Sequence, residues 1–129
     1  MVDDDDDILT MLSCAVEEWG YSVFTAKDGN QALETVDHIP RLALVLLDLR
    51  IPGRGGMEVL KEIHAQHPTI GVIMLTGVVD REIAHQAMKL GAFDYVSKPV
   101  DLPALESVIV ACLSHAEYHH QSLWKRLVG

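Results

Sequence analysis

The chain has 129 residues, 49% of them hydrophobic, and a formal net charge of −9 at pH 7, which suits one globular domain and excludes a largely disordered protein. The acidic balance, without a face of clustered Lys and Arg, argues against direct nucleic-acid binding and favours cationic ligands or basic partner surfaces. Apolar runs such as LALVLL are too short to span a bilayer and the N-terminus lacks a secretory signal, so we expect a soluble, cytoplasmic protein without membrane association.

Helices and strands are predicted to alternate along the chain. Apolar residues at three- and four-residue spacing, bounded by Gly, Pro and Asp, predict helices, and short runs rich in aliphatic and β-branched residues predict strands. The predicted helices occupy about 8–19, 29–39, 56–67, 81–90 and 102 onward, and the predicted strands occupy 21–26, 42–47, 69–75 and 93–97. This alternation indicates an α/β fold whose parallel sheet is covered by helices on both faces.

The two cysteines, Cys14 and Cys112, do not have the spacing of a metal site. Both fall in apolar helical patterns, where free cysteine behaves as a small hydrophobic residue. We therefore expect reduced thiols in the core and no disulfide.

The opening MVDDDDDIL contains five consecutive aspartates. Such runs are usually disordered and exposed, but here Met1 and Val2 are predicted to end a central first strand, so that the run combines a strand end with a helix cap. Such a strand normally has about five residues. We therefore expect either that residues preceding Met1 are missing from this sequence or that another chain or segment fills the gap.

Polar side chains follow the other predicted strands. Asp48, Thr76 and Lys98 each come directly after a predicted strand, and the carboxyl ends of parallel strands form the ligand-binding edge of such sheets. Singly, each is more often a cap, turn or exposed residue. Together with the aspartate run, they form an arrangement suited to magnesium-assisted phosphoryl transfer, because crowded carboxylates need a cation to offset their charge.

Four motifs, VDDDDDIL, LLDLRIPGRGG, MLTG and DYVSKP, occur in the order found in the receiver domain of two-component response regulators, which this sequence resembles up to about residue 116. The resemblance implies a doubly wound, flavodoxin-like sheet of five parallel strands in the order 2-1-3-4-5. Two helices would cover one face and three the other. Residues 1–116 would form the receiver domain, with a truncated first strand, and 117–129 a helical extension or linker.

The resemblance also implies a metal-dependent phosphoryl acceptor. Asp48 would accept the phosphoryl group, and Mg²⁺ (or Mn²⁺) would be held by Asp3, Asp4, Asp48 and the backbone carbonyl of Arg50. A register slipped by one residue, with Asp4 and Asp5 as the acidic pair, remains open.

The same resemblance implies a switch. Thr76 and Lys98 would bond the added phosphoryl oxygens, Tyr95 would change rotamer with Thr76, and Pro99 would follow a cis peptide bond. The face formed by the fourth helix, fifth strand and fifth helix would then change its packing. The domain would thus be a phosphoacceptor that assists its own phosphorylation and dephosphorylation, not an enzyme acting on a separate substrate.

Several partners follow from this resemblance. The phosphodonor would be a sensor histidine kinase or phosphotransfer protein, and the switching face would bind an output domain or protein. Apolar residues continue at helical spacing from Ile109 to Leu127, so we expect the last helix to extend and its stripe to support a homodimer. A frayed linker is the alternative.

Two other functions fit parts of this pattern. A haloacid dehalogenase-type phosphatase also uses an Asp after a strand, but needs a second Asp where Arg50 stands. A pseudo-receiver that binds partners without phosphorylation is the second alternative. Within the receiver interpretation, Arg50 and Val78 flank the path of the hydrolytic water and predict slow loss of the phosphoryl group.

Overall fold

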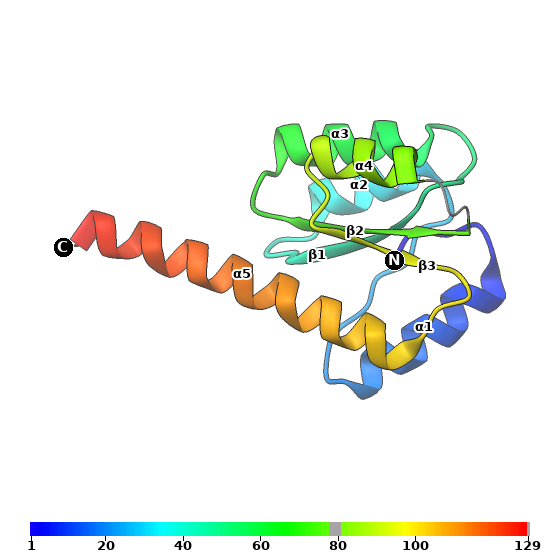
Figure 1. Cartoon of the computed structure of the whole chain (residues 1–129), viewed down its shortest axis with the longest axis horizontal. Coiled ribbons are helices and arrows are strands. Elements are labelled where there is room, and N and C mark those ends of the chain that lie inside the picture. Colours follow the sequence, from blue (N-terminus) through cyan, green and yellow to red (C-terminus); the bar gives the residue numbers. More distant parts are fainter. Residues whose placement is uncertain (78–80, 129) are drawn as a thin grey trace.

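The computed structural model describes residues 1–77 and 81–128, with side-chain surroundings up to His115. The helices are α1 (Asp6–Glu18), α2 (Gly29–His38), α3 (Gly56–Gln66), α4 (Arg81–Lys89) and α5 (Leu102–Val128), and the strands are β1 (Leu44–Asp48), β2 (Gly71–Thr76) and β3 (Asp94–Ser97). The three strands are parallel and lie in the order β1-β2-β3. Helices α2, α3 and α4 cover one face of the sheet, and α1 and α5 cover the other (Figure 1). The predicted α/β fold class is confirmed.

The core consists of two apolar layers on opposite faces of the sheet. Because successive side chains of a strand point to opposite faces, Val45 and Leu47 of β1 join the layer beneath α2 and α3. Leu46 joins the layer beneath α1 and α5. Burial of both faces explains why β1 and β2 read as continuous apolar runs instead of alternating ones.

The first two strand positions of the predicted sheet are reduced to single bridges. Val2 pairs in parallel with Ala26 on one side and Leu47 on the other, which preserves the order 2-1-3 at this edge. The prediction of a full strand over 21–26 is wrong, since only Ala26 is bridged. The reason is physical: a strand extends only as far as its neighbour, and the neighbour here consists of Met1 and Val2.

The last three residues of the aspartate run form the start of helix α1. Asp5 caps α1, because its side chain accepts hydrogen bonds from the backbone N–H groups of Asp7 and Ile8. Asp6 and Asp7 occupy the first turn of α1, where negative charge is favourable. The prediction that the run combines a strand end with a cap is therefore confirmed.

Helix α5 runs from Leu102 to Val128 and projects past the sheet toward the C-terminus (Figure 1). Asp101 precedes it and accepts a hydrogen bond from the N–H of Ala104. The division of the chain at residue 116 stays a prediction. Within the described residues, no helix is long and apolar enough to cross a membrane.

The two cysteines differ in their surroundings. Cys112 is buried beneath the sheet as predicted, and burial raises the pKa of its thiol to about 11. Cys14 is exposed, so the prediction that it lies in the core is wrong. Leu12 and Val16 form the buried stripe of α1, and Cys14 lies two residues from each, which turns it to the opposite side of the helix.

Candidate functional site at the carboxyl edge of the sheet

The carboxyl edge of the sheet gathers the polar residues singled out in the sequence. Asp3 follows the Val2 bridge, Asp48 ends β1, Thr76 ends β2 and Lys98 follows β3. Asp3, Asp48 and Thr76 are 2%, 6% and 7% exposed, and among the described residues they are the buried polar or charged ones. Burying a polar group without a partner is costly, so the gathering of buried polar side chains at this edge indicates a functional site.

Lys98 joins two of the carboxylates. Its Nζ lies 2.7 Å from Oδ2 of Asp3 and 3.3 Å from Oδ2 of Asp48. Burial alone disfavours the ammonium, but the hydrogen bond to Asp3 and the charge of Asp48 outweigh it, so the pKa of Lys98 lies above its usual range. Lys98 is therefore held as a cation between two acidic side chains.

For Asp48, the effects that raise the pKa of the carboxyl group outweigh those that lower it. Burial raises the pKa of its carboxyl group, and the hydrogen bond from the backbone N–H of Arg50 to Oδ1, at 3.3 Å, opposes that effect. The nearby charge of Asp3 raises the pKa further, while Lys98 lowers it. The net direction is upward, mainly because burial disfavours the ionised carboxylate.

The acidic group has the composition of a divalent metal site. Carboxylate oxygens of Asp3, Asp4 and Asp48 lie within 4.8 Å of one another. Oxygen ligands with an exposed member are what Mg²⁺ prefers, because it keeps several of its waters. With Lys98, the three carboxylates leave a net charge of −2, which one divalent cation neutralises. The residues present therefore fit Mg²⁺.

Asp5, the alternative member of the acidic pair, is not in this group. Its side chain is engaged in capping α1, whereas Asp3 accepts a hydrogen bond from the N–H of Asp5 at 3.0 Å. Asp3 and Asp4 therefore lie close to Asp48, whereas Asp5 caps helix α1.

The remaining predicted residues lie around this centre. The N–H of Lys98 donates to the carbonyl of Thr76 at 2.7 Å, which ties the two loops together. Tyr95 lies on β3 with 43% of its surface exposed, and the Lys98–Pro99 peptide bond is cis, as predicted. The side chain of Arg50 is exposed. Val78, predicted to slow dephosphorylation, lies outside the described residues.

The sequence interpretation did not identify Gly56 as a site residue. A Cβ at this position would lie 2.6 Å from the carbonyl oxygen of Asp48 and 2.7 Å from that of Leu49. Only glycine therefore lets the start of α3 approach the backbone that carries Asp48. In the sequence, Gly56 belongs to the run GRGG, which entered the interpretation only as part of the motif LLDLRIPGRGG.

Comparison with known proteins gives a consistent family. The family described as "Response regulator receiver domain" matches residues 1–110. The transcriptional regulatory protein ZraR of Escherichia coli (strain K12) is 40% identical over 115 residues, which are 89% of this chain and 26% of ZraR. The DNA-binding transcriptional regulator NtrC of Klebsiella pneumoniae is 34% identical over 121 residues, 94% of this chain and 26% of NtrC.

Solved structures agree with the fold. A CheY-like response regulator receiver domain protein from Methanospirillum hungatei JF-1 has a TM-score of 0.87 at 30% identity, covering 92% of this chain and 94% of that one. NtrX from Brucella abortus has a TM-score of 0.86 at 32% identity, covering 94% of this chain and 27% of NtrX. This chain thus spans about a quarter of the length of the curated relatives it matches.

Proposed function

This chain belongs to the response regulator receiver domain family, whose members act in phosphorelay signal transduction, and within that function we propose that Asp48 is the residue that accepts the phosphoryl group. The observation that carries the proposal is the contact of one ammonium, on Lys98, with two buried carboxylates at strand ends, Asp3 and Asp48. Such an acceptor is a signalling domain and not an enzyme in the ordinary sense.

In the proposed reaction, a carboxylate oxygen of Asp48 attacks the phosphorus of a phosphohistidine or of a small acyl phosphate. The new bond is the O–P bond of an aspartyl phosphate, and the bond that breaks joins phosphorus to the donor's nitrogen or oxygen, which leaves with its electron pair. When bound by Asp3, Asp4, Asp48 and the Arg50 carbonyl, Mg²⁺ would supply positive charge to the transferring oxygens.

The chain's own groups assist in distinct ways. The N–H of Arg50 holds Oδ1 of Asp48, so the carboxylate is oriented before the donor arrives. Lys98 would bond a phosphoryl oxygen once Asp48 is modified, and the Thr76 hydroxyl would bond another. Because Lys98 contacts Asp3 and Asp48 in the unmodified protein, phosphorylation would change its partners. That exchange would be the first step of the switch.

The switch would be transmitted to the face formed by α4, β3 and α5. Tyr95 lies on this face and pairs through β3 with Met74 of β2, two residues before Thr76. The names of the relatives, a transcriptional regulatory protein and a DNA-binding transcriptional regulator, support the proposal that the output is transcriptional. Lys98→Ala should leave some phosphorylation but remove its effect on partner binding by this face.

Labelling tests the assignment of Asp48. Acetyl phosphate and Mg²⁺ should label the wild-type protein with a hydroxylamine-labile phosphoryl group, and Asp48→Asn should abolish labelling, because an amide is not a competent nucleophile. Asp37→Asn is a matched control, since Asp37 is an exposed carboxylate paired with His67 away from the site. Undiminished labelling of Asp48→Asn would contradict the proposal, and an unlabelled wild-type protein would favour the pseudo-receiver.

A further inference from the structure

The loop that joins β1 to α3, residues 49–55, carries Arg50, whose backbone carbonyl is one of the proposed metal ligands. The base of this β1–α3 loop is closed by a hydrogen bond from the N–H of Gly56 to Leu49 O at 3.1 Å. Its tip turns at Gly53, whose φ of 77° lies in the left-handed region that favours glycine. Arg50 lies between the base and the tip, so the position of its carbonyl depends on what holds the tip.

The start of α2 holds the tip of the β1–α3 loop. Gly29, the first residue of α2, is buried, and its N–H donates to Pro52 O at 3.4 Å. A Cβ on Gly29 would lie 2.6 Å from Arg54 O and 2.9 Å from Cγ2 of Val59, closer than Cβ atoms approach other atoms in proteins. The backbone of the loop therefore packs directly against the backbone of α2, with no room for a side chain between them.

Glycine is required at position 29 by lack of space and not by backbone conformation. Gly29 lies in a helix and its φ is not positive, so a residue with a side chain could adopt the same backbone angles. The start of the helix does not need it either, because Asp28 already caps α2 by accepting a hydrogen bond from the N–H of Gln31 at 2.8 Å. Contact with the β1–α3 loop is therefore the feature of this position that demands glycine.

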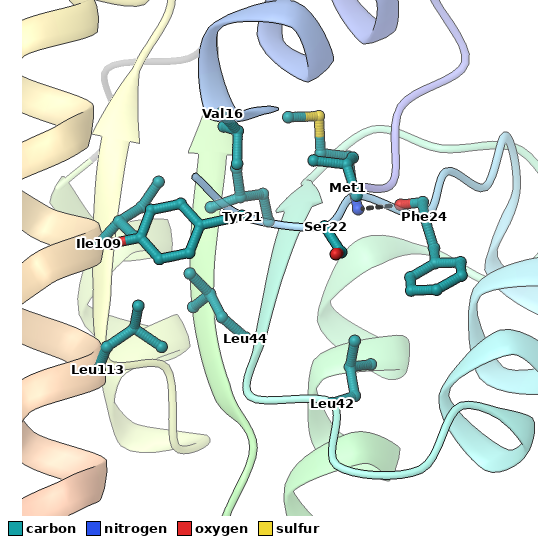
Figure 2. A pocket seen from close by; sticks show the side chains of 11 residues that line it. Met1, Val16, Tyr21, Ser22, Phe24, Leu42, Leu44, Ile109 and Leu113 are labelled. Atoms are coloured by element: carbon teal, nitrogen blue, oxygen red, sulfur yellow. Dashed lines mark hydrogen bonds between the residues drawn. The ribbon is translucent and has the colours of Figure 1, made fainter. Parts of the chain in front are cut away.

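The segment that leads into α2 also contacts the other side of the acidic site. Met1 lies beside Phe24, whose carbonyl oxygen accepts a hydrogen bond from the Met1 amino group at 2.9 Å (Figure 2). Two residues further along each segment, the N–H of Asp3 donates to Ala26 O at 3.1 Å. The short stretch from Ala26 to Gly29 therefore bonds to both backbone segments that carry proposed metal ligands, the one with Asp3 and the β1–α3 loop.

We propose that Gly29 is a positioning residue for the metal site: because it lets the β1–α3 loop pack on α2, it holds the Arg50 carbonyl where it can join Asp48 as a ligand. This inference rests on the proposed function, since it takes Arg50 as a metal ligand. Gly29 has no side chain that could act on the metal, so it acts through the loop. Groups that hold metal ligands in place commonly contribute about 10–100-fold to metal affinity.

A pair of glycine variants tests the proposal. Gly29→Ala inserts a methyl group into the contact, whereas Gly55→Ala adds the same group to the β1–α3 loop at a position where a Cβ meets no atom within 4 Å and φ is −62°. Titration with MgCl₂ at constant ionic strength and low temperature, followed by the amide NMR signals of Asp3 and Asp48, measures the Mg²⁺ affinity of the folded proteins without a phosphodonor. We expect Gly29→Ala to weaken Mg²⁺ binding by about tenfold or more and Gly55→Ala by less than about twofold.

The outcomes separate a positioning role from a merely structural one. If Gly29→Ala lowered the melting temperature but bound Mg²⁺ as tightly as the wild-type protein, Gly29 would serve stability alone and the proposal would be overturned. That result would leave the proposed function intact, because the wild-type protein would still bind Mg²⁺ and be labelled at Asp48. A wild-type protein that showed no saturable Mg²⁺ binding would refute the metal site and the role of Gly29 together.

Hydrogen exchange of the wild-type protein tests the same coupling if Gly29→Ala does not fold. If Mg²⁺ binds when the loop is packed on α2, the bound ion must in turn stabilise that contact. Mg²⁺ at ten times its Kd should therefore slow exchange of the Gly29 amide by about tenfold. The amide of Ile39, bonded to Thr35 O at the opposite end of α2, should be protected less. Equal protection of the two amides, or none, would overturn the proposal.

Discussion

The ion pairs of Lys98 allow a quantitative test, because the chain contains a second lysine pair with the same separation. Lys98 Nζ lies 2.7 Å from Asp3, with side chains 19% and 3% exposed, and Lys27 Nζ lies 2.7 Å from Asp6, with side chains 60% and 72% exposed. The two pairs differ mainly in burial. Replacing each lysine by methionine removes the charge and keeps a long apolar side chain, so the comparison isolates the effect of burial.

We expect Lys98→Met to destabilise the metal-free protein by about 3 kcal/mol, the lower end of the cost of leaving a buried charge without its partner. The lower end applies because the Lys98 side chain is 19% exposed, so water can partly solvate the charges that remain. Lys27→Met should cost less than about 1 kcal/mol. For a domain of this length, Lys98→Met should lower the melting temperature by roughly 10 °C.

Urea unfolding followed by circular dichroism, in EDTA at pH 7, measures both variants. The difference between them should shrink at acid pH, because protonated carboxyl groups no longer need the ammonium. Equal destabilisation of Lys98→Met and Lys27→Met, or a Lys98→Met loss that is unchanged in acid, would refute the view that Lys98 neutralises the carboxylates of the site.

Two further predictions concern the metal and the packing. Mg²⁺ should raise the melting temperature of the wild-type protein in a concentration-dependent way, and Asp3→Asn should greatly reduce that rise. Gly71→Ala should destabilise by about 1–3 kcal/mol, because a Cβ there would overlap the sulfur of Cys112, whereas Gly77→Ala meets no atom within 4 Å and should cost little in the same urea titration.

The positions at strand ends predicted from sequence which polar residues lie close together, because this prediction depends on few features. Asp48, Thr76 and Lys98 each stand at the end of a predicted strand, and parallel strands place such positions at one edge whatever the loop details. The contacts themselves could not be predicted in this way. Lys98 bonding to Asp3, across 95 residues of sequence, depends on the path of the loop after β3, and nothing in the local pattern specifies that path.

The errors have a common physical origin. A strand-like composition predicts a strand only where another strand is present to pair with it. The segment YSVFTA has such a composition but little neighbouring strand to pair with. The exposed position of Cys14 could have been found, because counting residues from Leu12 and Val16 places it off the buried stripe. The role of Gly56 was harder to predict, because a close approach between two backbone segments leaves no periodic pattern in the sequence.

The segment that carries Asp3 lies between the two segments that carry Ala26 and Asp48, and its backbone bonds to both. Thr76 and Lys98 are carried by strands paired over several residues, whereas Asp3 is carried by the single bridged residue Val2. Hydrogen bonds on both sides, from Asp48 N to Val2 O at 2.9 Å and from Asp3 N to Ala26 O at 3.1 Å, hold this segment in register. The bond to Asp48 joins the backbones of two proposed metal ligands directly. The relative position of Asp3 and Asp48 in the acidic site therefore depends on the hydrogen bonds that hold Val2 and Asp3 in register.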